Sequence, residues 1–365
     1  MRRLALAAAT LGMMAGAAPL GAAEAPMPRY AHIFVIIEEN QGFDRIIGSP
    51  DAPNLTRLAG RYGLATQFYG EVHPSEGNYI ALLGGDTFGI HDDDANFCRP
   101  GVKDLACEKS DRPDYVDHTV TAPSLMAQLE AKGLTWKGYF EDIPAPGSDA
   151  VRWPRLDKPV PGKPAELYAM KHNGFMNFRS VQDDPVRAAK IVGFDQLGRD
   201  LKAGSLPAYA HIVPNQCNEM HGLDEGPNIP ADCRKGNLSG RIRRGDKVTA
   251  DLVTRIMRSR IWKSRENSAI VVTFDEDHHP KDGAAQPQGC CASDPRSAAN
   301  FGGGRIPTIV ITNHGPRGLS DPTPYNHYSL LRTTEAAFGL SPFLGHAADE
   351  GAGVVAMTPL FASGK

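Results

Sequence analysis

The sequence has almost no net charge and no long apolar run beyond its first two dozen residues. Lys and Arg together number 39 and Asp and Glu 42, which leaves a net charge of -3 at pH 7. This balance gives no general electrostatic reason to bind nucleic acid, so an anionic ligand must be held by a local site. Because no later segment is apolar for long enough to cross a bilayer, we expect no stable membrane insertion once the N-terminal segment is removed.

The sequence also lacks the motifs of several common enzyme classes. It contains no G-x-S-x-G elbow, no P-loop with Gly-Lys-Ser/Thr and no H-E-x-x-H. These absences disfavour α/β-hydrolase, NTPase and zincin chemistry. The six cysteines show no paired CxxC spacing, so a zinc finger is excluded as well.

The first 23 residues have the three zones of a secretory signal. Arg2 and Arg3 carry positive charge, an Ala- and Leu-rich run continues to about residue 20, and small residues end at Ala23. We expect cleavage after Ala23 and a periplasmic or secreted location, with a single domain over residues 24–365. A retained membrane anchor is the alternative.

An exported chain with an even number of cysteines is expected to form disulfides. The natural local pairs, which close short loops, are Cys98 with Cys107 and Cys217 with Cys233. Cys290 and Cys291 are adjacent, and a bond between neighbours would strain the intervening peptide. We therefore expect these two cysteines to reach other partners or to stay partly free.

Short runs of β-branched residues predict buried strands at residues 32–37, 208–213, 269–274 and 306–311. Amphipathic segments between them predict helices at residues 122–132, 193–203 and 250–259. This alternation predicts an α/β fold with a mostly parallel central sheet and helices on both faces. Stretches rich in Pro, Gly and Asp predict long loops over the site, near residues 86–120 and 144–184.

A polar cluster follows each of the predicted strands, at residues 38–40, 214–218, 275–279 and 312–314. In open α/β sheets the ligand crevice lies just beyond the carboxyl ends of the strands. We therefore expect all four clusters to converge on one site.

Two of these clusters contain candidate metal ligands, Glu39 with Asn40 and Asp275 with Glu276. Carboxylate and amide oxygens suit a hard divalent cation. Residues 275–279 combine three carboxylates with two imidazoles, and unneutralised carboxylates at this density would repel one another. The alternatives are a turn or cap at Asn40 and a solvated acidic loop at 275–279.

Ser75 is a candidate nucleophile. It lies at the expected N-cap of a helix, where backbone N–H groups and the helix dipole favour a phosphate. A metal ion at its oxygen would lower the pKa of the hydroxyl and supply an alkoxide. The alternative is that Ser75 only caps the helix.

Three histidines, His172, His221 and His327, lie in polar loops that also carry asparagine. A lone histidine is usually structural. Several histidines beside asparagines, together with the carboxylate clusters, are better explained by anion and metal binding.

These motifs resemble those of the bacterial phosphoesterase family that joins secreted acid phosphatases and phospholipases C, a branch of the alkaline phosphatase-like superfamily. The matching segments are ENQGFD from Glu39, HPSEGNYIALLGG from His73, KHNGF from Lys171, Pro214-Asn215, TFDED from Thr273 and YNHYSLLRTTEAAFGL from Tyr325. The resemblance extends over residues 30–350 and implies an alkaline phosphatase-like fold.

The resemblance also implies roles for individual residues. Ser75 would be the nucleophile, and His221 and His327 would take part in catalysis. The expected phosphate contacts are His172 and, as second choices, Asn78 and Asn215. The expected metal ligands are Glu39, Asn40, Asp275 and Glu276.

The activity implied is that of an exported, metal-dependent acid phosphatase acting on phosphomonoesters, including phosphoinositide head groups, through a phosphoserine. The divalent metal stays open among Ca, Mg, Mn, Fe and Zn. A phospholipase C-type phosphodiesterase is one alternative. A non-enzymatic exported metal- or phosphate-binding protein is the other, and the motif around Ser75 disfavours it.

Overall fold

The computed structural model describes residues 26–93, 118–154, 166–226, 228–278, 288–292 and 302–362. The expected signal segment, the pair Cys98 and Cys107, and His279 lie outside these ranges. Within these ranges, no helix combines the length and the apolar character needed to cross a membrane.

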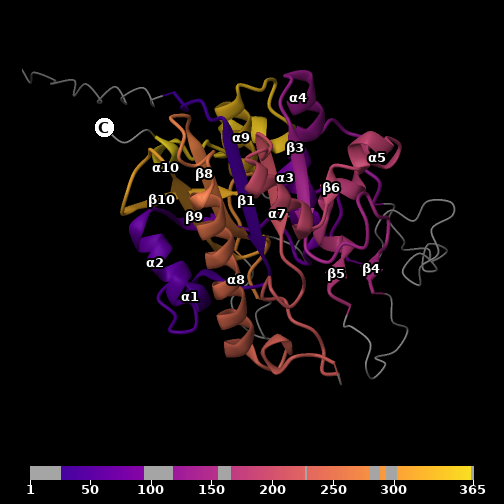
Figure 1. Ribbon diagram of the computed structural model, residues 1–365. Helices are drawn as coiled ribbons and strands as arrows, with labels where there is room; N and C mark the ends of the chain where they lie inside the picture. The colour runs from indigo at the N-terminus through magenta and orange to yellow at the C-terminus, as the bar shows by residue number, and fades with distance from the viewer. Residues whose placement is uncertain are drawn as a thin grey trace, which may run out of the picture.

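A mixed but mostly parallel sheet forms the centre of the protein (Figure 1). Its strands are β1 (His32–Glu38), β2 (Gly63–Tyr69), β3 (Trp136–Phe140), β6 (Ile191–Val192), β7 (Tyr209–Val213), β8 (Ser268–Phe274), β9 (Arg305–Thr312) and β10 (Leu319–Asn326). Their spatial order is β10-β2-β9-β8-β1-β7-β3-β6. The four strands predicted from sequence are therefore present, as β1, β7, β8 and β9. A separate antiparallel ribbon pairs β4 (Arg152–Trp153) with β5 (Tyr168–Ala169).

Strand β9 runs against both of its neighbours, β8 and β2, whereas the other strand pairs of the sheet are parallel. The carboxyl end of β9 therefore lies at the edge of the sheet where β8 begins. Asn313 Oδ1 accepts a hydrogen bond from Ser268 N–H at 2.9 Å there, and His314 contacts Ser264 O at 3.1 Å. The expectation that residues 312–314 join the other three polar clusters is wrong, because it assumed a parallel β9.

The helices are α1 (Phe43–Ile46), α2 (Pro53–Arg61), α3 (Glu76–Gly84), α4 (Leu125–Ala131), α5 (Arg179–Gln182), α6 (Pro185–Ala188), α7 (Phe194–Ala203), α8 (Leu238–Arg258), α9 (His327–Phe338) and α10 (Thr358–Phe361). Short 3₁₀ turns are η2 (Met170–His172), η3 (Gly174–Asn177), η4 (Ala231–Cys233), η5 (Gly345–Ala348) and η6 (Glu350–Ala352). The predicted helices correspond to α4, α7 and the second half of α8.

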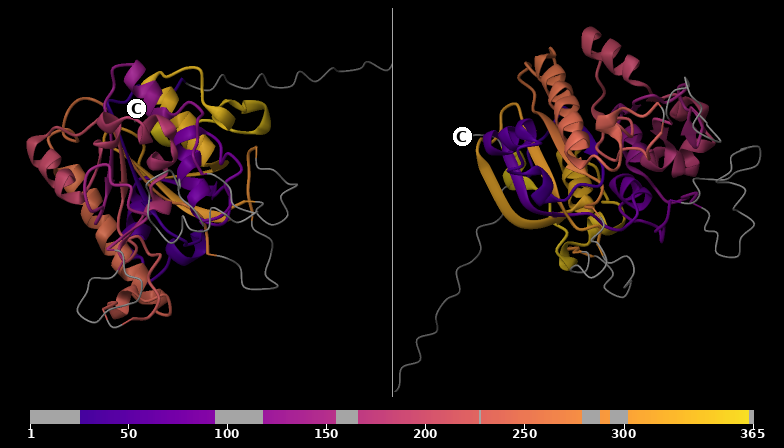
Figure 2. Two further views of the ribbon diagram at one scale, coloured as in Figure 1. Left: turned by 90° about the vertical axis from the view of Figure 1, so that its right-hand side faces the viewer. Right: turned by 90° about the horizontal axis from the view of Figure 1, so that it is seen from below.

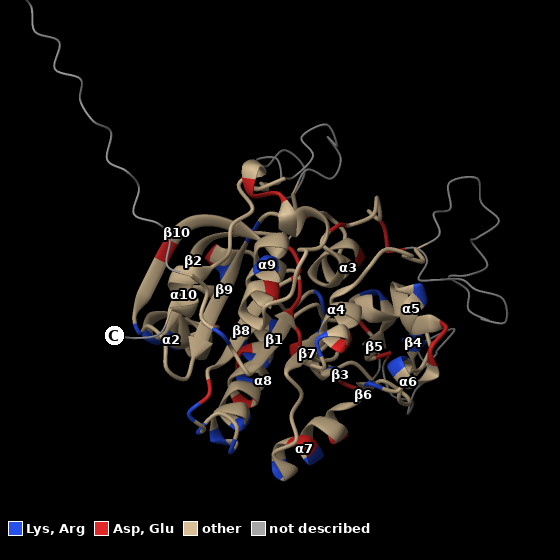
Figure 3. Ribbon diagram, turned by 90° about the horizontal axis from the view of Figure 1, so that it is seen from above, with Lys and Arg blue, Asp and Glu red and all other residues tan. Residues whose placement is uncertain are grey.

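Helices cover both faces of the sheet, as the alternating sequence pattern predicts. Helices α3, α4 and α9 lie on one face and α2, α7 and α8 on the other (Figures 1 and 3). The views in Figure 2 show α8 and α9 on opposite sides of the strands. The apolar residues of β1 and β8 are accordingly at most 1% exposed, which explains their unbroken apolar runs.

Cys290 and Cys291 form a disulfide with each other. The expectation that they reach other partners or stay partly free is therefore wrong. The backbone accommodates this bond with positive φ values at Cys291 (58°) and Ala292 (63°). The main-chain oxygens of both cysteines accept hydrogen bonds from Asn326 Nδ2, at 3.1 and 2.8 Å, next to the start of α9.

Helix α9 buries a carboxyl group, Glu335, that is 0% exposed. Its Oε1 accepts a hydrogen bond from Leu344 N–H at 3.0 Å. Burial raises the pKa of Glu335 to about 8, despite opposing effects from Gln128, Leu344 and Arg332. The folded state therefore binds a proton at this position across the neutral range.

This raised pKa makes stability depend on pH. The contribution of the protonated carboxyl is fully present below the ordinary pKa of 4.5 and is lost as the pH rises through about 8. Glu335→Gln has no carboxyl to titrate at this position and so does not lose this stability. Between pH 5 and 8, its free energy of unfolding should therefore rise relative to that of the wild type, by up to ~1.4 kcal/mol per pH unit. Free energies of unfolding from denaturant titrations at several pH values check this, with the surface variant Glu266→Gln as control. Parallel profiles for wild type and Glu335→Gln would contradict it.

Candidate active site

The parallel register of β1 and β8 brings two of the predicted acidic clusters together. Glu38 pairs with Phe274, so the residues that follow leave the sheet side by side. Asp275 N–H donates to Glu38 O at 3.1 Å, and Asn40 N–H donates to Asp275 Oδ1 at 3.0 Å. The carboxyl ends of these two strands thus form the floor of the site.

The loop after β7 reaches the same place. Glu39 N–H donates to Glu219 O at 2.7 Å, and the same loop carries His221. The predicted disulfide between Cys217 and Cys233 is present and closes this loop. Three of the four polar clusters therefore converge, as expected for the carboxyl edge of a parallel sheet.

Asn40 has a left-handed backbone, with a φ of 58°. Asparagine tolerates this region better than most residues, so the turn suggested by the sequence is real. Its side-chain Nδ2 also donates to Glu39 Oε2. The turn thus holds the amide of Asn40 against the carboxylate of Glu39, and the two interpretations of Asn40 are compatible.

Ser75 occupies the N-cap position of α3 but does not cap it. Its backbone is helical (φ -51°, ψ -46°), and its hydroxyl makes no capping hydrogen bond. The Oγ atom instead lies 3.4 Å from Glu39 Oε2 and 3.4 Å from Glu276 Oε1. Gly70, five residues before Ser75, permits close packing of its backbone against the end of β8, because a Cβ atom there would lie 2.7 Å from Asp275 O. The Ser75 hydroxyl is thus presented to the acidic cluster.

The acidic cluster around Ser75 is buried, and two of its carboxyl groups have raised pKa values. Burial, followed by Glu39 and Glu276, raises the pKa of Asp275 well above its usual range. Burial also raises the pKa of Glu276 to about 7. Asp275 Oδ2 accepts no hydrogen bond from a donor within the described ranges. Such a cluster favours binding of a cation.

His73, two residues before Ser75, contacts the carboxylate of Glu276. Its Nδ1 lies 2.5 Å from Glu276 Oε2 and its Nε2 lies 3.2 Å from Asp277 Oδ1. Burial acts to lower the pKa of His73, but these two carboxylates outweigh burial and raise it to about 9. Gly304 makes room for Asp277, because a Cβ atom there would lie 2.1 Å from its carboxyl carbon. The sequence analysis missed His73, although its place in the His-Pro-Ser segment was a usable signal.

His172 lies on the other side of Glu39. Its Nε2 is 2.9 Å from Glu39 Oε1, and its Nδ1 is 2.9 Å from Glu219 Oε1. Burial acts to lower the pKa of His172, but the two carboxylates outweigh it and raise the pKa to about 10. Tyr79 stacks on the imidazole at 5.4 Å and donates to Glu39 Oε1 at 3.2 Å. Both Tyr79 and Glu219 therefore fix the orientation of predicted site residues.

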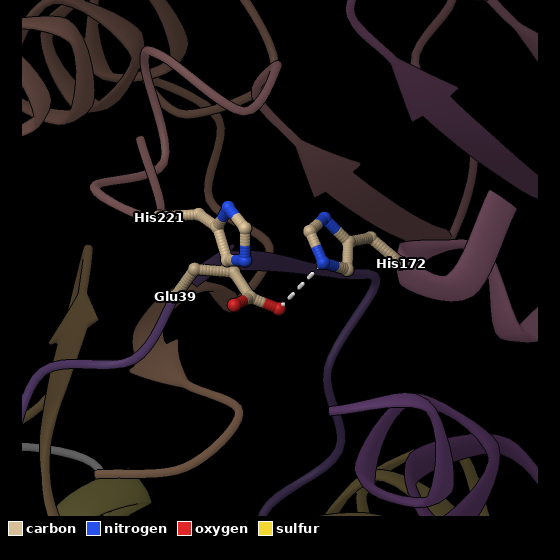
Figure 4. A group of neighbouring side chains, drawn as sticks. All are labelled: Glu39, His172 and His221. Atoms are coloured by element: carbon tan, nitrogen blue, oxygen red, sulfur yellow. Dashed lines mark ion pairs between the residues drawn. The ribbon is translucent and has the colours of Figure 1, made fainter. Parts of the chain in front are cut away.

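His221 completes a compact group with Glu39 and His172 (Figure 4). One ligand atom from each of the three residues lies within 4.8 Å of the others. His221 Nδ1 contacts Gly222 O at 2.7 Å, which leaves Nε2 available to the group. Burial, followed by the charge of Lys171, lowers the pKa of His221 to about 3.

Glu39 therefore belongs to two possible ligand sets for a metal ion. One set is all oxygen and surrounds Ser75: Glu39, Asn40, Asp275 and Glu276. The other set combines a carboxylate with two imidazoles: Glu39, His172 and His221. The first suits Ca or Mg, and the second suits Zn, Fe or Mn. Only the first set was expected from the sequence, which assigned His172 to phosphate binding and His221 to catalysis.

His327 is not a member of the histidine group. Its ring Nε2 contacts Phe274 O at 3.0 Å, directly before Asp275, and its main-chain N–H donates to Glu71 Oε1 at 3.0 Å. The side chain is 0% exposed, and burial lowers its pKa to about 4. In this structure His327 supports the end of β8.

The two predicted asparagines, Asn78 and Asn215, use their amides to hold loops. Asn78 Oδ1 accepts from the main-chain N–H groups of Glu71 and Val72 at 2.8 and 3.2 Å. Asn215 Nδ2 donates to Asp142 Oδ2 at 2.6 Å, and its Oδ1 accepts from main-chain N–H groups two and three residues later. Both lie near the site, but these bonds serve the loops that carry Ser75 and His221.

The fold and the site define the class of the protein, and comparison with known proteins names the family. The chain belongs to the Phosphoesterase family, whose model matches residues 49–341. The matched region contains Ser75, His172 and Asp275 and begins after Glu39 and Asn40.

Curated relatives give the activity class. A phosphatidylinositol-3-phosphatase of Mycobacterium tuberculosis is 30% identical over 343 residues, which are 94% of this chain and 88% of the relative. A phosphate-repressible acid phosphatase of Penicillium chrysogenum is 30% identical over 293 residues, 80% of this chain and 55% of the relative. The chain thus spans little more than half of that fungal protein. Family and relatives identify the chain as a phosphoric-ester hydrolase.

Solved structures support the fold. An alkaline phosphatase superfamily protein from Vibrio parahaemolyticus matches with a TM-score of 0.53 at 14% identity, covering 87% of this chain and 69% of that one. A lipoteichoic acid synthase from Listeria monocytogenes matches with a TM-score of 0.51 at 12% identity, covering 92% and 76%. The expected alkaline phosphatase-like fold is therefore confirmed.

Proposed function

We propose that the protein is an exported, metal-dependent acid phosphatase that hydrolyses phosphomonoesters, phosphoinositides among them, through a phosphoserine at Ser75. The observation that carries this proposal is the position of the Ser75 hydroxyl, which is free of a capping role and 3.4 Å from both Glu39 and Glu276. The names of the relatives, a phosphatidylinositol-3-phosphatase and several acid phosphatases, support the substrate class.

The residues around Ser75 fit a divalent cation. The carboxylates of Glu39, Asp275 and Glu276 are buried, and Asp275 Oδ2 lacks a hydrogen-bond donor within the described ranges. Asn40 would have to turn its amide to present oxygen, because Nδ2 now faces Glu39. When bound, the metal would offset this negative charge and lower the pKa of the serine hydroxyl.

The chain's own residues supply the other steps. Ser75 Oγ attacks phosphorus, the bond to the leaving oxygen breaks, and the alcohol leaves with a proton. His172 and His221 lie on the far side of Glu39 from Ser75, where they can contact phosphoryl oxygens. Of the two, His172 holds a proton that it can transfer to the alcohol, because its pKa is raised to about 10. Water then attacks the phosphoserine and releases phosphate. Of the two histidines expected in catalysis, His221 lies closer to Glu39 and His172, because the ring of His327 is hydrogen bonded to Phe274 O. The lowered pKa of His221 leaves its imidazole neutral, so it does not supply the proton to the alcohol.

Two further parts of the proposal concern location and reaction type. The Cys217–Cys233 disulfide suits an oxidising compartment, which supports export. The phosphodiesterase alternative stays testable, since a diester could enter the same site. The non-enzymatic alternative does not survive, because the chain belongs to an enzyme family.

Substrate preference tests the proposed function. The purified protein should release phosphate from p-nitrophenyl phosphate and from phosphatidylinositol 3-phosphate faster than it cleaves phosphatidylcholine. The reason is that the first two substrates present a terminal phosphomonoester to the charged and polar groups of the site, whereas the phosphate of phosphatidylcholine is a diester. Initial rates for all three substrates under one set of conditions provide the measurement. Phosphatidylcholine cleavage that outruns both monoesters would overturn the proposal.

Metal affinity tests the oxygen ligand set. Asp275→Asn should weaken binding of the activating cation by ~10-fold or more, because it removes one anionic oxygen ligand. Metal titration of the chelator-treated protein, followed by calorimetry and by activity, measures the change, and excess metal should restore part of the rate. Asp251→Asn, an exposed carboxylate on α8, is the matched control. Unchanged affinity in Asp275→Asn would remove this residue from the ligand set.

A further inference from the structure

Lys171 connects the histidine side of the site to the start of helix α3. It directly precedes His172 in η2, and its Nζ pairs with Asp93 Oδ2 at 2.8 Å. The other oxygen of Asp93 accepts a hydrogen bond at 3.2 Å from the main-chain N–H of Glu76, the residue after Ser75. One carboxylate therefore holds the ammonium of Lys171 beside the helix end that presents the nucleophile.

The charge of Lys171 affects the pKa of Glu39, a member of the carboxylate cluster. Burial acts to raise the pKa of Glu39, but neighbouring basic groups hold it well below its usual range. These groups are His172, His221 and Lys171. The side chains of Lys171 and Asp93 are 20% and 25% exposed, so the pair is neither buried nor free in solvent. A lysine ammonium has three N–H donors, so it can keep its bond to Asp93 and also bind an anion that enters the site.

We propose that Lys171, held in place by Asp93, binds the second negative charge of a phosphomonoester and thereby sets a preference for monoesters over diesters. A monoester carries a charge of about -1.5 to -2 at neutral pH, whereas a diester carries one negative charge. A lysine ammonium acts on phosphate as a compact point charge, so it attracts the more highly charged monoester more strongly than the diester. This inference rests on the proposed phosphomonoesterase function and names what selects its substrates.

The test compares two substrates with the same leaving group, p-nitrophenyl phosphate and bis(p-nitrophenyl) phosphate. For Lys171→Met, kcat/KM on the monoester should fall by roughly 10- to 100-fold, the range for losing a hydrogen bond to a charged group. The value for the diester should fall by less than about threefold. Lys171→Arg keeps the charge and should recover most of the monoester activity.

Two further variants separate specificity from structure. Lys137→Met removes a lysine of β3 that pairs with Asp200 of α7, and it should leave the kinetics of both substrates unchanged. Asp93→Asn keeps Lys171 but loosens its placement, so monoester activity should fall more than diester activity. Equal losses on both substrates in Lys171→Met would overturn the inference and leave Lys171 a structural residue.

Binding of inorganic phosphate separates failure of this inference from failure of the proposed function. Calorimetric titration at pH 8 should show at least a tenfold weaker dissociation constant in Lys171→Met than in the wild type. If the wild type prefers diesters, the proposed function fails, and the phosphate titration still decides the role of Lys171. Unchanged phosphate binding in Lys171→Met overturns the role of Lys171, whichever ester the wild type prefers.

Discussion

Buried negative charge at the neighbouring ends of β1 and β8 is the constraint on which the site depends. The parallel register places Glu38 opposite Phe274, and the residues that follow are therefore forced together. Two histidines partly offset this negative charge, because His73 contacts Glu276 and His172 contacts Glu39. Carboxylates at this density are costly without compensation, which supports the proposal that they bind a cation and act on a phosphoryl group.

Glu39 links the two halves of this arrangement. Its Oε2 faces Asn40 and Ser75, whereas its Oε1 faces His172 and Tyr79. A change at this one carboxylate would therefore disturb both the nucleophile and the histidine group. In the proposed reaction, this connection would let residues from β1, the β7 loop and η2 act on one phosphoryl group, although they lie far apart in the sequence.

Much of the fold and part of the site could be predicted from the sequence. Apolar runs located the buried strands, and polar residues after them located Glu39 and Asp275. The direction of β9 could not be read from its own residues, because an antiparallel buried strand has the same apolar run. The role of Ser75 was also open, since a capping serine and a nucleophile occupy the same position. His73 and Lys171 gain their roles from contacts with Asp277 and Asp93, which only the folded chain brings close.

The central claim is that Ser75 carries the phosphoryl group, and trapping the intermediate tests it most directly. Turnover of p-nitrophenyl phosphate is quenched with acid, and the modified peptide is mapped by mass spectrometry. The account predicts phosphate on Ser75 and a loss of kcat by at least ~10³ in a folded Ser75→Ala variant. Its stability should change little, because the hydroxyl makes no capping bond. Phosphate on a histidine, or near-normal turnover in Ser75→Ala, would contradict the account.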